Sequence, residues 1–194
     1  MSRMSIQSSY SVANRTANLK IRTSDDEIIG AWFVLSDPYY RSLSSIPSDP
    51  AEHIVPALQR SPVVLFLHGN AATRAFGARV RHYQAFTSRL GANVLAIDYR
   101  GFADSTGKPS EVGLVRDARA AFNWLLAQGK TAKDILIIGH SLGTGVSGQL
   151  AVELNNEGIE FRGVVLLSVS RLLDRFAWRD LHLSCSHLPA LHKF

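Results

Sequence analysis

The sequence predicts an α/β fold in which helices cover both faces of a mostly parallel sheet. Short, fully apolar runs alternate with longer segments whose apolar residues recur at helical spacing. Strands that are apolar on both faces are typical of parallel sheets, and the helices that connect them supply the cover. With 194 residues and 46% hydrophobic content, the chain is long enough for one domain with a sizeable core.

The chain opens with two strands and a turn. Residues 18–23 and 27–35 alternate between apolar and polar side chains, and a Ser-Asp-Asp turn separates them, so we expect an antiparallel pair. Residues 36–61 are rich in Pro, Ser and Asp. We expect them to form a surface excursion with at most a short helix over 51–59.

Four further apolar runs follow, at 63–67, 94–97, 135–138 and 164–167. Helical patterns lie between them, with apolar positions at Phe76, Val80, Tyr83, Phe86 and Leu90, and then at Val112, Val115, Ala118, Phe122 and Leu125. Ser110 is placed to cap the second of these helices. Alternating units of this kind join parallel strands through right-handed crossovers.

The third run ends in the sequence Gly139-His140-Ser141-Leu142-Gly143, after which a helical pattern begins. This arrangement is typical of a nucleophile elbow, a sharp strand-to-helix turn that exposes a serine. A serine hydroxyl is a poor nucleophile, so its site must hold it near a base and near donors for the oxyanion. Because the turn crowds the chain, the positions two before and two after the serine must lack bulk, as Gly139 and Gly143 do.

A second loop, His68-Gly69-Asn70, follows directly after the first parallel run. A glycine there lets the backbone approach a substrate, and the amide of Asn70 can then point at an oxyanion alongside the amide of Leu142. Sites in parallel sheets lie at the carboxyl ends of the strands, where Ser141 is also expected. The alternative is that His68 is a buried structural histidine and the loop a plain turn.

Other polar residues near this edge are expected to be structural. Asp98 and Arg100 follow the next run, and Asp104 lies a few residues later. The acid of a serine triad in this fold follows the serine along the chain, so we expect these residues to hold neighbouring loops together.

The formal net charge of +5 does not indicate a nucleic-acid partner, because the cations are scattered along the chain. The densest group is Arg74, Arg79, Arg81 and Arg89 on a helix predicted over 75–90. We expect a solvated helix face there. The alternative is attraction to anionic lipid headgroups, which would allow peripheral membrane contact.

Three features of the sequence bear on the location of the protein. No apolar run reaches the length of a membrane span, and the N-terminus has no secretory apolar core. The single cysteine, Cys185, cannot form an internal disulfide, which favours a reducing compartment. We therefore expect a cytoplasmic or peripheral membrane location and leave the oligomeric state open.

Three segments together resemble a known family. LFLHGNAATR, LAIDYRGFADSTGKPSE and IIGHSLGTGV are similar, in order and spacing, to α/β-hydrolases of the lysophospholipid and monoacylglycerol lipase type. The resemblance implies Ser141 as nucleophile, the amides of Asn70 and Leu142 as oxyanion donors, and hydrolysis of a lipid acyl ester without metal or cofactor. A small-molecule lipid ester is the implied substrate, and a peptidase or thioesterase is the alternative within the class.

The resemblance ends after Val169. We expect a disordered segment over 1–17, a partial α/β-hydrolase domain over 18–169 that lacks the last two strands, and a divergent tail over 170–194. In the family the missing strands deliver the acid and the histidine of the triad, so we expect impaired catalysis. A non-catalytic fragment or pseudoenzyme is the rival function.

The tail offers two further alternatives. Its acidic residues and histidines follow the order serine, acid, histidine, and its histidines with the cysteine could be considered as metal ligands. Neither alternative is favoured. The tail lacks the residue patterns of strands that would position a histidine, and its histidines and cysteine are not spaced as in structural zinc sites. The residues concerned are Asp174, Asp180, His182, Cys185, His187 and His192.

Overall fold

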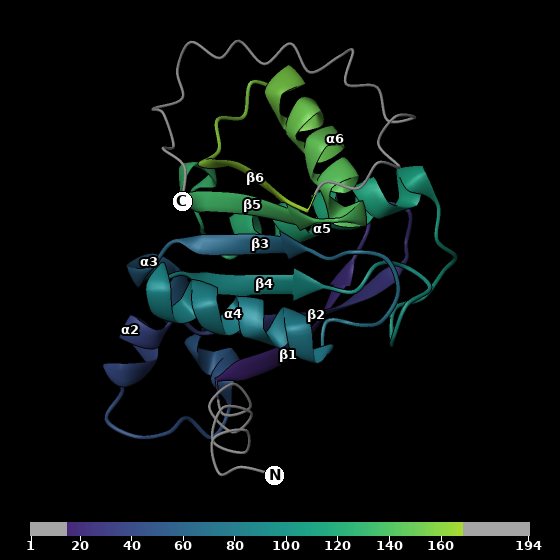
Figure 1. The fold of residues 1–194 in the computed structure, drawn as a ribbon. Coiled ribbons are helices and arrows are strands. Elements are labelled where there is room, and N and C mark those ends of the chain that lie inside the picture. The colour runs from purple at the N-terminus through teal and green to yellow at the C-terminus, as the bar shows by residue number, and fades with distance from the viewer. Residues whose placement is uncertain (1–14, 169–194) are drawn as a thin grey trace.

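A computed structural model describes residues 15–168 of the protein, which form a six-stranded sheet with helices on both faces (Figure 1). The strand order is β1-β2-β4-β3-β5-β6. β1 pairs antiparallel with β2, and β2 pairs antiparallel with β4, whereas β4, β3, β5 and β6 run parallel. The strands are β1 (Thr16–Arg22), β2 (Ile28–Val34), β3 (Val63–Leu67), β4 (Asn93–Ile97), β5 (Ile135–His140) and β6 (Gly163–Leu167).

Alternate residues of the central strands enter two separate hydrophobic clusters. In β3, Leu65 belongs to the cluster that contains buried residues of α3, α5 and α6, whereas Phe66 belongs to the cluster with α4 on the opposite face. Both side chains are fully buried. Helices cover both faces of these strands, which explains why both faces are apolar. The predicted fold class is confirmed. The helices that pack on the sheet include α3 (Ile54–Arg60), α4 (Gly77–Arg89), α5 (Glu111–Ala127) and α6 (Leu142–Asn156), and a 3₁₀ turn, η2 (Ala132–Asp134), precedes β5.

Most element boundaries agree with the sequence pattern. β1 begins at Thr16, two residues before the expected start, and pairs with β2 as predicted. Ser110 caps α5, and its hydroxyl accepts the N–H of Gly113 at 3.1 Å. The predicted terminal segments, 1–17 and 170–194, lie outside the described residues except for 15–17.

The segment 36–61 is more regular than the expected surface excursion. It contains α2 (Asp37–Arg41) and η1 (Pro50–His53) in addition to α3. Prolines stand in the first turn of both α2 and η1, where their fixed φ is compatible with a helix. The expectation of at most one short helix was therefore wrong, because these prolines begin helices rather than break them. The buried residues of α3 are Ile54, Ala57 and Leu58.

The basic residues of the predicted helix over 75–90 do not form one solvated face. Arg74 lies before α4 and is buried, and Arg79 is buried within it, whereas Arg81 and Arg89 are exposed. The expectation of a solvated position was wrong for Arg74 and Arg79. Arg74 pairs with Asp98, and Arg79 donates to main-chain carbonyls of the loop after β3. Three residues expected on apolar stripes are instead exposed near helix ends, namely Phe76, Leu90 and Val112.

Within residues 15–168, none of the helices combines the length and the hydropathy that crossing a membrane requires.

Candidate active site

Ser141 occupies the turn between β5 and α6, at the carboxyl edge of the parallel strands. Its φ of 51° and ψ of −115° lie in a region that residues other than glycine seldom adopt. The N–H of Ser141 donates to the carbonyl of Leu167 in β6 at 3.0 Å. Its carbonyl accepts the N–H of Thr144 at 2.9 Å and the hydroxyl of Thr144 at 2.6 Å. These bonds hold the strained turn between β6 and the first turn of α6.

Close packing around the turn leaves no room for side chains at Gly139 and Gly143. A Cβ on Gly139 would lie 2.7 Å from the carbonyl carbon of Gly143 and closer still to its oxygen. A Cβ on Gly143 would lie 2.6 Å from the carbonyl carbon of Leu67. In addition, the hydroxyl of Ser147 donates to the carbonyl of Gly143 at 2.6 Å. The small residues that the sequence pattern requires therefore have a steric cause.

The loop after β3 lies against Ser141. A Cβ on Gly69 would lie 3.1 Å from Cβ of Ser141 and 3.1 Å from Nδ1 of His140, so the main chain of this loop contacts the serine. Asn70 follows directly and is exposed. Leu142 is the first residue of α6, where backbone N–H groups have no partner within the helix. The structure thus brings together the two loops that the sequence pattern singled out.

Arg79, which the sequence analysis named only among the cations of the predicted helix, anchors this loop. Its guanidinium donates to the carbonyls of Gly69 at 2.9 Å, Ala71 at 2.6 Å and Thr73 at 2.7 Å. Burial lowers the pKa of Arg79, but an arginine remains charged in a folded protein. A signal was available, because Arg79 precedes the buried Tyr83 by four residues and so shares its helix face.

His68 is a buried residue that connects the loop to Asp98. Its Nδ1 lies 2.7 Å from the carbonyl oxygen of Gly69, and its Nε2 lies 3.3 Å from Oδ1 of Asp98. Asp98 also accepts the backbone N–H of Arg74 at 2.6 Å. Burial by itself raises the pKa of Asp98, but the neighbouring imidazole of His68 and the hydrogen bonds from Arg74 outweigh it and hold this pKa below its ordinary value. This geometry fits the structural interpretation of His68.

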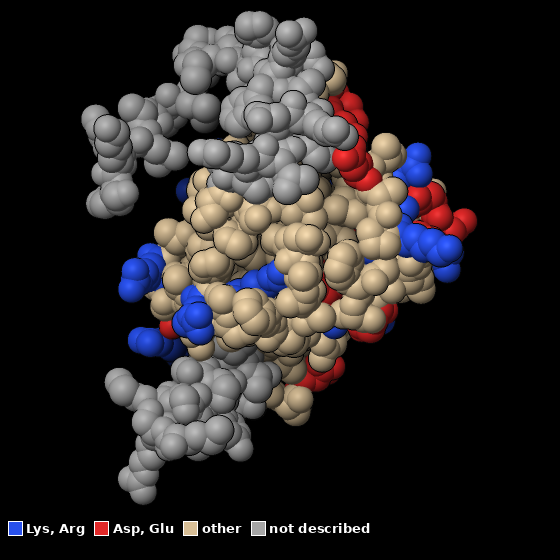
Figure 2. All heavy atoms as spheres, turned by 45° about the vertical axis from the view of Figure 1, so that its right-hand side comes forward, with Lys and Arg blue, Asp and Glu red and all other residues tan. Residues whose placement is uncertain are grey.

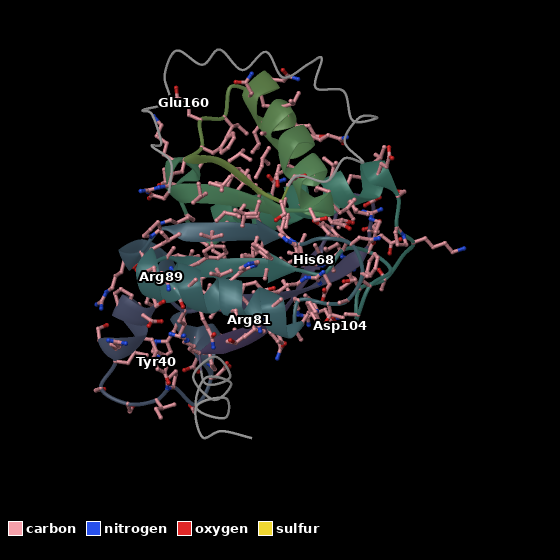
Figure 3. All side chains as sticks on the ribbon, viewed as in Figure 1. Tyr40, His68, Arg81, Arg89, Asp104 and Glu160 are labelled. Carbon is pink, nitrogen blue, oxygen red and sulfur yellow. The ribbon has the colours of Figure 1, made fainter. Side chains whose placement is uncertain are left out.

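Arg100 and Asp104 also hold loops together, as expected. Arg100 donates from Nε to Asp117 at 2.9 Å and from its terminal nitrogens to Asp25 at 2.8 and 2.9 Å. Asp104 accepts from Arg74 at 2.7 Å. Figure 3 shows His68 and Asp104 near the carboxyl edge of the sheet, with Arg89 toward the opposite edge.

Two partly buried histidines, His82 of α4 and His140 of β5, lie close to each other, and His140 directly precedes Ser141. The ring centroids of His82 and His140 are 5.7 Å apart, and the ring of His82 also lies 5.7 Å from that of Phe66. Burial is the main cause that lowers the pKa of both imidazoles; the neighbouring His140 adds to it for His82, and Arg79 adds to it for His140. Over residues 15–168, no hydrogen bond joins an imidazole to the hydroxyl of Ser141.

The residues considered for a tail triad or metal site, Asp174, Asp180, His182, Cys185, His187 and His192, lie outside the described residues. Within 15–168, no group of three or more His, Cys, Asp or Glu side chains could hold a metal ion. The face shown in Figure 2 has a broad area without charged side chains, interrupted near its centre by Lys or Arg, and further Lys and Arg side chains lie toward its margins.

The doubly covered sheet and the strained serine turn define the class of protein. A model of the alpha/beta hydrolase family matches residues 64–192. The chain therefore belongs to the alpha/beta hydrolase family. The crystal structure of an alpha-beta hydrolase from Vibrio vulnificus superimposes with a TM-score of 0.61 at 23% identity, covering 84% of this chain and 50% of that one. At this identity the likeness supports the fold alone.

Within this family, the chain is similar to curated relatives named ABHD12 and ABHD12B. Lysophosphatidylserine lipase ABHD12 of Rattus norvegicus is 37% identical over 141 residues, which is 73% of this chain and 34% of the relative. Protein ABHD12B of Homo sapiens is 33% identical over 151 residues, 78% of this chain and 41% of the relative. The chain thus spans little more than a third of the length of these relatives.

Proposed function

We propose that the chain carries the nucleophile and the oxyanion-binding part of a serine hydrolase for lipid acyl esters. The observation that carries the proposal is Ser141, held at positive φ in a strand-to-helix turn with Gly69 packed against it. In the reaction, a histidine takes the proton of the Ser141 hydroxyl and the serine oxygen attacks the ester carbonyl. The amides of Asn70 and Leu142 stabilise the oxyanion, and water then hydrolyses the acyl-enzyme.

The proposed substrate is a single-chain lipid ester, either a lysophospholipid or a monoacylglycerol. Relatives at 36–37% identity are named as lysophosphatidylserine lipases, which supports the first of these. The proposed reaction uses no metal or cofactor.

The general base of this proposal comes from outside residues 15–168, because no imidazole within that range is hydrogen-bonded to Ser141. A triad enzyme without its histidine retains only oxyanion and binding effects, on the order of 10³ to 10⁴ over water. We therefore propose that residues 15–168 alone turn over esters slowly. The same observation, that no imidazole within 15–168 is hydrogen-bonded to Ser141, favours the rival function, a non-catalytic fragment.

Labelling with a fluorophosphonate probe tests the nucleophile. We would compare the chain with a chimera in which the residues after Ser168 are replaced by the corresponding part of the rat relative. The expected result is labelling of Ser141 in the chimera, lost in Ser141→Ala and retained in the exposed control Ser88→Ala. A folded chimera that is not labelled would contradict the role of Ser141.

Substrate assays separate the remaining alternatives. The chimera should hydrolyse lysophosphatidylserine or monoacylglycerol faster than acyl thioesters or peptides, and the opposite order would refute the lipid assignment while leaving Ser141 as nucleophile. The chain itself should hydrolyse p-nitrophenyl butyrate near the background rate. A large Ser141-dependent rate would contradict the proposed impairment, and alanine substitutions at His182, His187 and His192 would then identify the base.

A further inference from the structure

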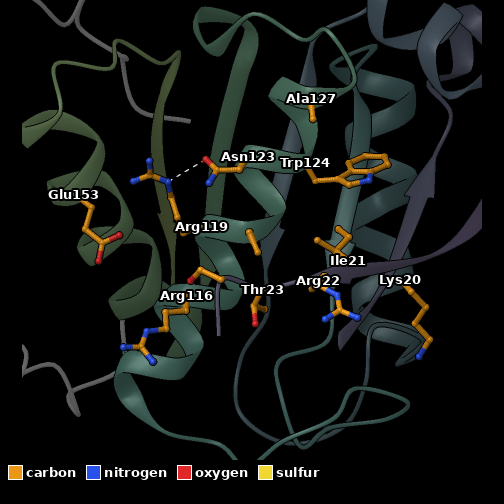
Figure 4. Close-up of a pocket in the computed structure, with 12 residues that line it drawn as sticks. Lys20, Ile21, Arg22, Thr23, Arg116, Arg119, Asn123, Trp124, Ala127 and Glu153 are labelled. Carbon is orange, nitrogen blue, oxygen red and sulfur yellow. Dashed lines mark hydrogen bonds between the residues drawn. The ribbon is translucent and has the colours of Figure 1, made fainter. Parts of the chain in front are cut away.

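A groove of about 600 Å³ lies between β1 and α5 (Figure 4). Its apolar part includes Ile21 of β1 and Trp124 of α5. One acidic side chain, Glu153 of α6, also lines it. Four cationic side chains surround these residues, namely Lys20, Arg22, Arg116 and Arg119. The groove therefore combines an apolar interior with an excess of positive charge.

The free edge of β1 borders this groove. The N–H of Thr23 donates to the carbonyl of Glu27, and the N–H of Leu35 donates to the carbonyl of Arg15, so the odd-numbered residues of β1 bond to β2. In an antiparallel pair the alternate residues direct their N–H and C=O groups away from the partner strand. Those residues are Asn18, Lys20 and Arg22, and within 15–168 no backbone group bonds to theirs.

Two of the four cations of the groove, Arg22 and Arg116, can accept new partners, whereas Lys20 pairs with Asp104 at 2.8 Å and Arg119 pairs with Glu157 at 2.6 Å. Arg22 and Arg116 each use one terminal nitrogen, with Asp26 at 2.9 Å and Asp25 at 3.0 Å, and both arginines are more than half exposed. Exposed ion pairs of this kind contribute little to stability, so carboxylates of a ligand can replace or share them. Neither Asp25 nor Asp26 lines the groove.

The charge distribution decides which kind of chain suits the edge. A second copy would place Lys20 and Arg22 against the same cations, which is unfavourable between paired strands. The terminal segments of this chain are also unsuited, because 1–14 contains Arg3 and no acidic residue, and 169–194 has more basic than acidic residues. An acidic segment is complementary to the groove.

We propose that this groove binds an extended acidic peptide segment of a partner protein, which adds to β1 as a further strand. Main-chain hydrogen bonds would form with the outward groups of Lys20 and Arg22, as in other cases of strand addition. Alternate side chains of an extended peptide point to opposite faces. Those on the side of α5 contact Ile21 and Trp124 and lie near Arg116. Those on the opposite side meet Lys20 and Arg22, whose side chains alternate with that of Ile21. A segment that alternates acidic and apolar residues fits best.

Fluorescence anisotropy with a labelled peptide of four Glu-Val repeats tests the proposal. We expect saturable binding that weakens as NaCl is raised, because the attraction is partly between exposed charges. The double variant Arg22→Gln/Arg116→Gln should bind about tenfold more weakly. The matched control Arg81→Gln/Arg89→Gln, which removes two exposed charges from α4, should stay within about twofold of the parent.

The folding of the double variant is protected, since Asp25 keeps both of its bonds to Arg100. Circular dichroism would verify this. A peptide N-methylated at alternate amides should bind about tenfold more weakly, because it cannot complete the strand ladder. Equal binding of the methylated peptide, of a Lys-Val peptide, or of the double variant would overturn the proposal.

Two further arms test other occupants. Phosphatidylserine vesicles that bind through Arg22 and Arg116, with no binding of the peptide, would assign the groove to a membrane surface and overturn the proposal. A chain without residues 1–14 that binds the peptide only after that deletion would show that the N-terminal segment occupies the groove, with the same consequence. Unchanged peptide binding after the deletion supports a separate partner.

Discussion

Replacing Arg79 with methionine should loosen the loop that lies against Ser141. The buried guanidinium donates to three carbonyls of that loop, at Gly69, Ala71 and Thr73. Methionine fills a similar elongated space but has no donor, so the variant removes the hydrogen bonds while preserving much of the packing. The expected result is a lower free energy of unfolding and a more mobile loop.

The size of the loss in unfolding free energy depends on which partner each of the three carbonyls has in the variant. Hydrogen bonds to charged groups contribute roughly 1.5–3 kcal/mol each, and less where water can replace the donor. Ala71 is exposed and its carbonyl can bind water, and the carbonyl oxygen of Gly69 keeps its 2.7 Å contact with His68. Removing a buried charge also recovers part of its desolvation cost. We therefore expect a net loss of about 2–3 kcal/mol, well below the simple sum.

Urea unfolding followed by circular dichroism measures this loss. Arg81→Met is the matched control, because Arg81 is exposed on the same helix and its substitution should change stability by less than about 0.5 kcal/mol. Arg79→Lys keeps the charge but not the planar fork, so it should fall between the parent and Arg79→Met. Hydrogen exchange of the amides over 69–73 should become faster in Arg79→Met. Equal stability and equal exchange in the methionine variants at positions 79 and 81 would refute the anchoring role.

Two other predictions concern the packing and the titration of the site. Gly143→Ala should destabilise the fold by more than about 3 kcal/mol in thermal unfolding, because its Cβ would collide with the main chain of Leu67. Gly77→Ala, whose Cβ meets nothing within 4 Å, should instead stabilise by about 0.5 kcal/mol, and equal effects of the two substitutions would contradict the steric account. Burial, with a further contribution from His140, lowers the pKa of His82, so the unfolded chain binds more protons below the ordinary value of 6.5. The contribution of neutral His82 to stability should therefore be fully present above pH 6.5 and be lost as the pH drops from 6.5 through the folded pKa. His82→Gln should reduce this loss when urea midpoints are compared at pH 7 and pH 5.

The strands and the serine turn were predictable because their signals are local. Apolar runs of five residues, such as Val63–Leu67, have a length and pattern that suit a strand buried on both faces. The glycines around Ser141 were identified from spacing alone, since a tight turn excludes Cβ atoms wherever it occurs. The segment 36–61 was misread because proline can begin a helix as well as end one, and composition does not separate the two cases.

The sequence by itself determined the class of fold, the position of Ser141 at the end of a parallel strand, and the two loops that meet there. Only the tertiary structure decided that Arg79 is buried beneath one of those loops and that Arg81, two residues later, is exposed. It also decided that Lys20 and Arg22 of β1 line a groove together with residues of α5. The physical reason is that strand and turn patterns depend on neighbours along the chain. The surroundings of a charged side chain depend instead on carbonyls, carboxylates and strands that are distant in sequence and come together only on folding.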